Sequence, residues 1–388
     1  MNHKLIAAGM ITITATIIGF YPNHNNDANA KTVLLQQIEK PKIQIAILLD
    51  TSSSMSGLIN QTRSQLWQVV NEFTRANKNG ITPSLEVAVY EYGNNQLSSD
   101  NGFIRQITPL TGELDQVSEA LFSLTTNGGN EYCGAVINTA VQELNWSTSN
   151  SDIKTIFIAG NEPFSQGPIA FSQAIAAAKS KGITVNTIHA GNDQTGINTG
   201  WQQGALLAGG DYMSIDHNHR VAHINAPQDD EIQILNQKLN STYVPYGKEG
   251  AAKIQRQAKQ DEKNKAVSPA LMVKRARSKA SSLYDNSSWD LVDAVDSGKI
   301  NVESLQESQL PSPMKKLSEK ERKVYIKAKT TERRDIQQKI KALSQKRSEY
   351  VKEKKREAKS PSAITVNDAV SASIRKQGEL KNYVFESK

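Results

Sequence analysis

A short aliphatic run that ends abruptly in polar residues constrains this chain more than any other feature. The stretch at 42–57 reads KIQIAILLDTSSSMSG, and its aliphatic run over 43–49 ends at Asp50. Turn-forming residues and then a helical pattern follow, which predicts a buried parallel strand that leads into a helix. Ligands of open α/β sheets bind outside the carboxyl ends of the strands, so we expect Asp50, Ser52 and Ser54 at a crevice.

These three residues bring one carboxylate and two hydroxyl groups together within five positions. Hard oxygen ligands of this kind suit Mg²⁺ or Mn²⁺, with water in the remaining coordination positions. The first hypothesis is therefore a divalent-metal site that serves recognition. The alternative is a structural role without any cofactor, in which Ser54 or Ser56 caps the start of the following helix.

Apolar segments alternate with helical patterns as far as residue 215. Strands are expected at 43–49, 85–92, 103–110, 153–159, 183–188 and 212–215, and helices at 58–77, 114–124, 135–144, 168–181 and 201–208. Strands that alternate with helices of about 10 to 15 residues indicate an α/β fold with a doubly wound, mostly parallel, Rossmann-like sheet.

Three loops on the expected crevice side carry a more specific pattern. The first is DTSSS from Asp50 to Ser54, the second lies in GGNEYCGAV at 128–136, and the third lies in FIAGNEPF at 157–164. Together they resemble a von Willebrand factor type A domain with its metal-ion-dependent adhesion site. That family uses D-x-S-x-S in the first loop, a Thr in the second and an Asp in the third. Here the first motif is complete, Asn130 stands in place of the Thr, and Gly160 stands in place of the Asp.

The resemblance implies a binding module in which a bound metal accepts a carboxylate from a partner protein, so that adhesion or assembly is expected rather than turnover. Four further residues are candidate ligands, directly or through water: Asn130, Glu131, Asn161 and Glu162. The alternative for each is a loop residue that satisfies turn backbone. The interpretation is a half-retained adhesion site.

The first thirty residues have the features of a secretory signal peptide. A basic start, MNHK, precedes an apolar stretch at 5–20 and a small-residue motif that ends at Ala30, where we expect cleavage. The alternative is an uncleaved membrane anchor, although the stretch is short for a span of about 20 residues. The mature protein is expected to be exported, either periplasmic or secreted. Cys133 is the only cysteine, which excludes an intramolecular disulfide, and it is expected to be buried.

Charge divides the chain into two parts. Residues 1–247 carry 13 Lys and Arg against 20 Asp and Glu, a net charge of −7, whereas 248–388 carry 33 against 19, a net charge of +14. Such an asymmetry commonly marks a domain boundary. The predicted organisation is a signal peptide at 1–30, a linker at 31–41, an α/β domain at 42–245, a helical region at 246–311, a long basic helix at 312–360 and a C-terminal tail at 361–388.

The long basic helix is expected from Ser318 to about 359, because this segment lacks Gly and Pro and begins with a capping box of Ser318 and Glu321. Ile336, Leu343 and Tyr350 repeat every seven residues. This stripe is typical either of a coiled coil or of a packing face within the same chain.

The positive charge of the C-terminal part has four interpretations. Nucleic acid is not expected as a partner, because the chain is predicted to be exported and no aromatic platform is interleaved with the basic residues. The others are attraction to an anionic envelope surface, a solvated helix with Lys/Glu pairs, and an intramolecular contact in which the basic part rests on the acidic domain.

No motif supports catalysis. The patterns GxSxG, HExxH, GxGxxG and the Walker loop are absent. No set of nucleophile, base and orienting group stands out either, so the chain is not expected to be an enzyme. His217, His219 and His223 have a spacing that suits a borderline metal, but no Cys or acidic residue completes a ligand pattern. His189 ends an apolar strand and is expected at the edge of the core.

The leading prediction is an exported module of the von Willebrand type that recognises an unidentified protein at the Asp50 crevice, assisted by a divalent metal. The second hypothesis is a structural envelope protein that works through its basic helices. A hydrolase is the third. The oligomeric state is left open.

Overall fold

The computed structural model describes residues 40–55, 67–215, 224–357 and 366–385. The predicted signal peptide and its cleavage site lie outside the described residues, as do His217, His219 and His223. All described residues belong to one compact unit. None of their helices combines the length and the apolar character needed to cross a bilayer.

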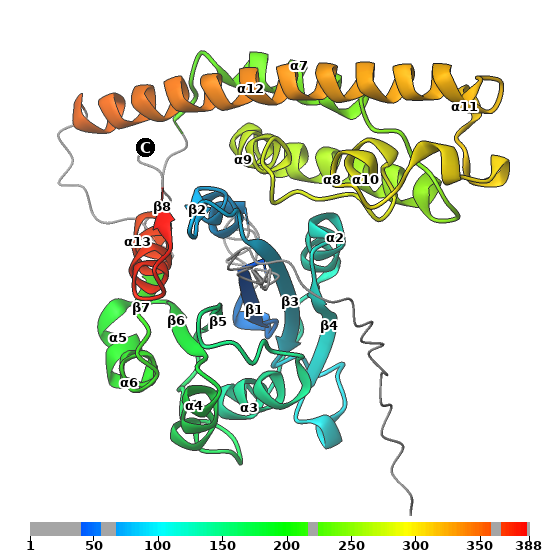
Figure 1. Ribbon diagram of the computed structural model, residues 1–388. Coiled ribbons are helices and arrows are strands. Elements are labelled where there is room, and N and C mark those ends of the chain that lie inside the picture. The colour runs from blue at the N-terminus through cyan, green and yellow to red at the C-terminus, as the bar shows by residue number, and fades with distance from the viewer. Residues whose placement is uncertain (1–39, 56–66, 216–223, 358–365, 386–388) are drawn as a thin grey trace, which may run out of the picture. The chain divides into compact units, whose positions relative to one another are not determined.

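A six-stranded sheet forms the centre of this unit, with the strand order β4-β3-β1-β5-β6-β7 (Figure 1). Every neighbouring pair is parallel except β3 and β4, which are antiparallel. The strands are β1 Lys42–Asp50, β3 Ser84–Tyr92, β4 Ile104–Thr111, β5 Ile153–Gly160, β6 Thr184–Ala190 and β7 Tyr212–Ile215. The prediction of a doubly wound, mostly parallel sheet followed by a helical region is confirmed.

Strand β1 is buried on both faces, and its alternate residues enter two different cores. Ile43, Ile45 and Leu49 join the core on one face, while Ala46 and Leu48 join the core on the other. The helical segment 67–73 and α2 (Leu114–Ser123) pack in the first core. The second core is covered by α3 (Cys133–Glu143), α4 (Phe171–Ser180) and α6 (Trp201–Leu207), with α5 (Asp193–Asn198) beside α6.

The helix expected at 58–77 ends earlier than predicted. Its described part covers 67–73, and Ala76–Asn77 forms a short strand, β2. This strand pairs antiparallel with β8 (Val384–Phe385), near the C-terminus. A contact between residues about 300 positions apart thus decides the conformation here, so the end of the helix at 77 was wrong.

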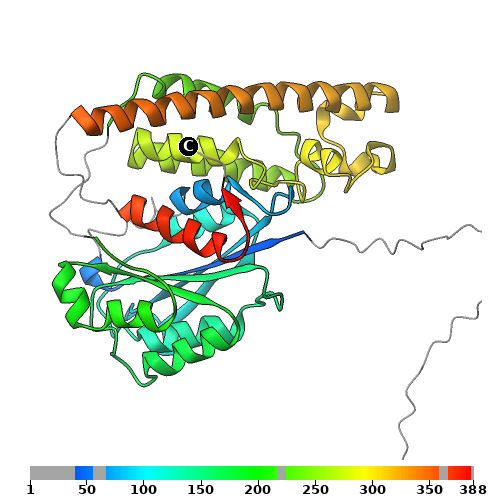
Figure 2. The same ribbon diagram turned by 60° about the vertical axis from the view of Figure 1, so that its left-hand side comes forward.

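The C-terminal helix α13 (Val366–Glu379) shares the first core of the sheet, with Val370 and Ile374 buried there. Ser373 and Gln377 donate hydrogen bonds to the buried Asn186 side chain of β6, at 3.0 and 2.8 Å. Figure 2 shows α13 in red beside the sheet. The interval interpreted as a tail therefore contributes a helix and a strand to the sheet core.

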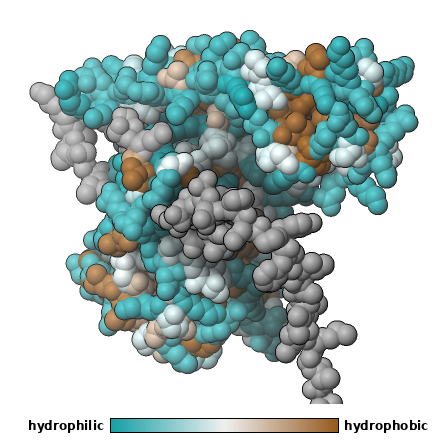
Figure 3. Space-filling model, in the orientation of Figure 1, coloured by the Kyte–Doolittle hydropathy of each residue, from teal (hydrophilic) through white to brown (hydrophobic). Residues whose placement is uncertain are grey.

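The remaining helices form an insert between β7 and α13, at the top of Figure 1. They are α7 Asp229–Asn240, α8 Gly250–Val267, α9 Pro269–Lys279, α10 Leu291–Asp296, α11 Ser312–Lys315 and α12 Glu319–Glu357. Short 3₁₀ turns occur at Ser53–Met55, Ser99–Asn101, Val302–Ser304 and Glu307–Gln309. Figure 3 shows mostly hydrophilic residues along α12 and an apolar area at the α10–α11 end.

Helix α12 begins as its sequence predicts. Ser318 N donates to Glu321 Oε2 at 2.8 Å, and Glu321 N donates to Ser318 Oγ at 3.4 Å, which is a capping box. Ile336 and Ile340 are buried in the core that α7 and α9 share, and Leu343 packs against it. The apolar stripe of this helix therefore serves packing within the same chain.

A buried ionic cluster joins the insert to the sheet domain. Arg275 of α9 is fully buried and pairs with Asp115 of α2 at 2.8 Å, while its Nε donates to Asp261 of α8 at 2.6 Å. Its guanidinium also lies 5.1 Å from the ring centre of Trp67. Further ion pairs between the basic and acidic parts are Lys253–Glu113, Arg256–Glu119, Arg375–Glu72 and Lys376–Asp211. The intramolecular interpretation of the basic charge is thus realised at these residues.

Because α13 completes the core of the sheet, Ile374→Ala should lower the free energy of unfolding by about 2–5 kcal/mol, the usual cost of removing a buried Ile side chain. Chemical denaturation of the full chain measures this. Leu380→Ala is the matched control, since Leu380 is 76% exposed, and it should change stability by less than about 0.5 kcal/mol. Equal effects of the two substitutions would contradict the packing of α13.

Candidate functional site

Asp50 lies at the carboxyl end of β1, where three loops meet. The main chain ties these loops together: Thr51 N donates to Tyr92 O at 2.9 Å, Asn127 N donates to Thr51 O at 3.1 Å, and Asn95 N donates to Gly128 O at 3.1 Å. The loop after β1 is therefore fixed to the loop after β3 and to the one that leads into α3. The predicted crevice position of Asp50 follows from this arrangement.

Asp50, Ser52, Ser54 and Asn161 form a continuous chain of hydrogen bonds. Asp50 Oδ1 accepts from Ser52 N at 2.7 Å, and the hydroxyls of Ser52 and Ser54 lie 2.7 Å apart. Ser54 Oγ donates to Asn161 Oδ1 at 2.8 Å. Ser52 is buried and Ser54 is exposed, so the chain leads from the interior to the surface.

The carboxyl groups of Asp50 and Glu131 lie over the same glycine. A Cβ atom at Gly93 would stand 2.8 Å from both Asp50 Oδ1 and Glu131 Cγ, so a side chain is excluded there. Glu131 is held by its main chain, because Glu131 N donates to Gln166 Oε1 at 2.9 Å. Both residues are buried, at 0% and 3% exposure. Two carboxyl groups are thus brought together at the foot of the crevice.

One oxygen of each carboxyl group has no donor. Asp50 Oδ2 and Glu131 Oε2 are buried and accept no hydrogen bond from the part of the chain that the structure describes. Burial, and then the charge of Glu131, raise the pKa of Asp50 well above its ordinary value. Burial also raises the pKa of Glu131, whereas hydrogen bonds with Asp50 and Ser52 lower it by a smaller amount. The pair therefore needs a proton or a cation between its oxygens.

The side chains of two predicted site residues do not join this group, although the main chain of Glu162 forms a hydrogen bond with Glu131. Asn130 is exposed and forms no hydrogen bond with any residue the structure describes. Glu162 is half-buried; its main-chain oxygen accepts from Trp201 Nε1 at 2.8 Å, and its charge raises the pKa of Glu131. Asp50, Ser52, Ser54, Glu131 and Asn161 are the candidates that the fold brings together.

Gly160, which stands where the family pattern has an Asp, is surrounded by other side chains. A Cβ at this position would lie 2.5 Å from Tyr92 Oη, 3.0 Å from Trp201 Cη2 and 3.3 Å from Asp50 Cβ. Tyr92 is itself held by a hydrogen bond to Ala159 O at 3.1 Å. The space of the missing carboxylate is therefore occupied, and Glu131 is the second acidic group of the crevice.

The oxygen ligands of the crevice suit a hard divalent cation, although only two of them are carboxylate oxygens. The two buried oxygens without donors, the hydroxyls of Ser52 and Ser54, and the amide oxygen of Asn161 are all hard ligands. Among the described residues no group of three or more His, Cys, Asp and Glu is placed to hold a metal. Neutral oxygens and water would thus complete the coordination.

Three residues of the crevice were not predicted from the sequence: Gly93, Tyr92 and Gln166. Gly93 carries a weak signal, because a glycine directly after a buried strand indicates a close approach of another group. Tyr92 and Gln166 carry none, since their roles depend on residues far away in the chain.

Two other expectations concern buried residues near the crevice. Cys133 is 1% exposed, as expected, and its Sγ lies 3.6 Å from Tyr92 Oη. His189 is the next-to-last residue of β6 and is 1% exposed, with Nε2 3.3 Å from the main-chain oxygen of Asn161. Both predictions of a position in or at the core are confirmed.

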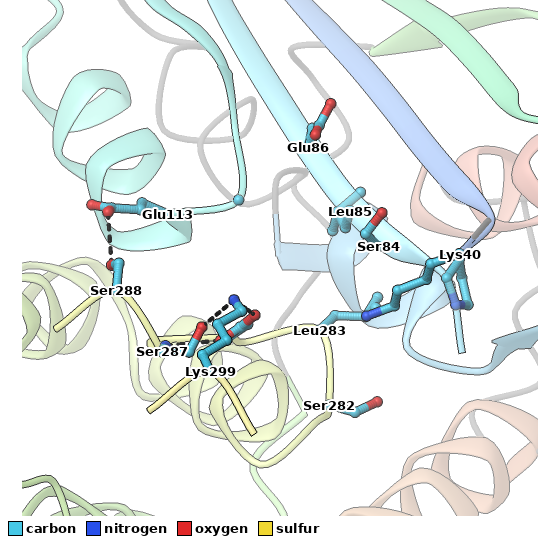
Figure 4. A pocket seen from close by; sticks show the side chains of 13 residues that line it. Lys40, Ser84, Leu85, Glu86, Glu113, Ser282, Leu283, Ser287, Ser288 and Lys299 are labelled. Atoms are coloured by element: carbon cyan, nitrogen blue, oxygen red, sulfur yellow. Dashed lines mark hydrogen bonds and ion pairs between the residues drawn. The ribbon is translucent and has the colours of Figure 1, made fainter. Parts of the chain in front are cut away.

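A cavity of about 230 Å³ lies at the opposite end of the sheet, between the start of β3 and the α9–α10 segment of the insert (Figure 4). Several of its polar groups bind one another: Ser288 Oγ donates to Glu113 at 3.1 Å, and Lys299 lies 3.4 Å from Asp285. None of the predicted site residues lines it. The crevice at Asp50 therefore remains the candidate site.

The sequence profile of the von Willebrand factor type A domain matches residues 44–196, the span from β1 into α5. This span contains all the candidate metal-ligand residues of the crevice. No curated protein matches the chain significantly.

Several solved structures are similar. BatB from Bacteroides thetaiotaomicron is 15% identical, with 57% of this chain and 99% of that chain covered and a TM-score of 0.35. An aerotolerance-related membrane protein from Bacteroides fragilis is 17% identical, with 45% and 92% covered and a TM-score of 0.32. Proximal thread matrix protein 1 from the mussel byssus, with a zinc-occupied MIDAS motif, is 12% identical, with 46% and 43% covered and a TM-score of 0.35. The match thus spans less than half of the mussel protein, and likenesses of this size carry no functional conclusion.

Because no described residue donates a hydrogen bond to Asp50 Oδ2, Asp50→Asn should stabilise the metal-free protein at neutral pH by about 1–3 kcal/mol, the cost of a buried unpaired polar group. A carboxyl group with a raised pKa binds its proton more tightly in the folded state. The wild type should therefore lose stability as pH rises from about 3.9 through the raised pKa, and the variant should lose less. Denaturation at several pH values with EDTA measures both.

Asp152→Asn is the matched control, because the Asp152 carboxylate accepts from Lys42 N at 3.0 Å and from Ser147 Oγ at 2.6 Å. It should destabilise the protein. Destabilisation by Asp50→Asn of the same size would show that Asp50 is fully partnered.

Placing the Asp of the resembling family pattern at position 160 should fail for steric reasons. Gly160→Asp and Gly160→Ala both add a Cβ that meets Tyr92 Oη, so each should destabilise the protein by about 1–3 kcal/mol, as overpacked cores do. Adding Tyr92→Phe removes that oxygen and should recover part of the loss. A stable Gly160→Asp protein, measured by thermal denaturation, would refute the packing described for this position.

Proposed function

We propose that the chain is an exported, non-catalytic binding module that recognises a protein partner at the Asp50 crevice, with Mg²⁺ or Mn²⁺ as the assisting ion. The single observation that carries this proposal is the pair of buried carboxyl oxygens, of Asp50 at the end of β1 and of Glu131 before α3, that accept no hydrogen bond from the described residues. Buried carboxyl groups that destabilise the fold when no metal is bound are typical of a ligand-binding site.

The residues of the crevice have separate tasks in this proposal. Asp50 and Glu131 supply negative charge, while Ser52 and Ser54 supply neutral oxygens on the path to the surface. Asn161 keeps the hydroxyl of Ser54 oriented through its 2.8 Å hydrogen bond. When bound, the cation supplies an open coordination position for a carboxylate of the partner.

Burial supports a binding role over catalysis. Asp50 and Glu131 are 0% and 3% exposed, so their oxygens reach a partner only through a bound ion or the hydroxyls above them. A general acid or base has to lie within hydrogen-bond reach of its substrate.

The alternative of an envelope protein that works through α12 receives less support. The apolar stripe of α12 is used within the chain, and several cations of the basic part form ion pairs with the acidic domain. Deletion of 312–388 does not separate the two hypotheses, because it also removes Ile340 and Ile374 from the core. Substitutions at the crevice are the cleaner test.

Calorimetric titration with Mn²⁺, Mg²⁺ and Ca²⁺ tests the proposal. We expect binding to the wild type, and Ser54→Ala should weaken Mn²⁺ binding by about tenfold or more, as the loss of a ligand does. Ser53→Ala is the matched control, because Ser53 lies between the two hydroxyl residues and forms no hydrogen bond with its side chain among the described residues. Absence of binding to the wild type at millimolar concentrations, or equal effects of Ser53→Ala and Ser54→Ala, would refute the proposed metal site.

A further inference from the structure

A groove of about 610 Å³ runs between the outer edge of the sheet and helix α3. None of the candidate metal ligands of the crevice lines it. Its lining residues are Tyr90, Asp100, Asn101, Gly102, Ile104, Arg105, Gln106, Ala135, Thr139, Glu143, Pro168 and Ile169. We call this the β4–α3 groove. Neither the family pattern nor the proposed metal site accounts for it.

One wall of the groove is the edge of the sheet itself. β4 is the outermost strand among the described residues, so the main-chain groups on its outer side pair with no strand that the structure describes. Ile104, Arg105 and Gln106 are consecutive, and their side chains alternate between the two faces of the sheet. Since all three line the groove, the main-chain edge between them borders it too.

The opposite wall is one face of α3. Ala135, Thr139 and Glu143 are four residues apart and so lie above one another on the helix. At 1.5 Å per residue this wall is about 12 Å long, which matches three to four residues of an extended peptide at about 3.4 Å each. The groove has the length and the walls of a strand-binding site.

The floor is polar but already ordered. Gln106 Nε2 donates to Tyr90 Oη at 2.8 Å, and Tyr90 Oη donates to Glu143 Oε2 at 3.2 Å. This chain of bonds links the strand wall to the helix wall, so a ligand would meet a preformed surface and would order few side chains on binding.

The charge of the groove is negative. Asp100 and Glu143 are exposed and form no ion pair with any described residue, whereas Arg105 is paired with the buried Glu91. Apolar surface comes from Ile104 and Ile169. A complementary segment therefore carries an apolar side chain and, three to four residues away, a Lys or Arg.

We propose that the β4–α3 groove binds an extended segment of a partner protein, which adds a strand to β4 and places a Lys or Arg at Glu143. Main-chain hydrogen bonds to a sheet edge supply affinity in this mode, and side-chain pockets supply selectivity. Binding here is independent of a metal, because no candidate metal ligand lines the groove.

A phage-displayed library of random 12-residue peptides, selected on the immobilised full chain in EDTA, provides the probe. The selected sequences should combine an apolar residue with a Lys or Arg three to four positions away. Fluorescence anisotropy of the synthesised peptides should then show at least about tenfold weaker binding to Glu143→Lys, which repels the cation, and to Thr139→Trp, which fills the groove.

Glu349→Lys is the matched control, since it makes the same charge change at an exposed position of α12. It should leave peptide binding unchanged, as should Asp50→Asn, which separates this proposal from the metal site. Failure to select any such sequence, or binding to Glu143→Lys and Thr139→Trp as tight as to the wild type, would overturn the proposal. So would light scattering that shows the wild type to be a dimer dissociated by Glu143→Lys, because the groove would then serve a second copy of the chain.

Discussion

A strand buried on both faces needs cover on both, and this requirement at β1 shapes the rest of the chain. The segment from β1 to β7 supplies enough helices for the face that receives Ala46 and Leu48, namely α3, α4 and α6. The other face receives Ile43, Ile45 and Leu49, and it is covered only in part by residues 67–73 and α2. Helix α13 completes that cover directly, and the insert packs onto the same helices through Arg275 and its neighbours. The acidic and basic parts of the chain thus form one folded unit rather than two independent modules.

The crevice illustrates how a site and the stability of its domain oppose each other. Gly93 allows Asp50 and Glu131 to share one small buried space, and no described residue donates a hydrogen bond to one oxygen of each. The surrounding contacts nevertheless hold the group in place: Gln166 binds the main chain of Glu131, and Asn161 binds Ser54. At Gly160, Tyr92 and Trp201 fill the space that a side chain would need, and Glu131 from another loop stands beside Asp50.

Strong local patterns made much of the fold predictable. The run that ends at Asp50, the alternation of strands and helices, and the capping box at Ser318 all depend on neighbouring residues, and all appear in the structure. The short strand at 76–77 depends on pairing with residues 384–385, which no local pattern reveals. In the site, the grouping of Asp50 with Ser52 and Ser54 followed from their spacing. The contact of Glu131 with Asp50 and the lack of contacts at Asn130 depend on how separate loops meet, so the sequence left these two residues equivalent.

The pairing of β8 with β2 also has a consequence for the order in which the protein is made. A ribosome adds residues at about 5–20 per second, so α13 and β8 leave it on the order of tens of seconds after β1. During that time the face of the sheet that receives Ile374 and Tyr383 has no permanent cover. The first core of the sheet is thus complete only once α13 and β8 have been made.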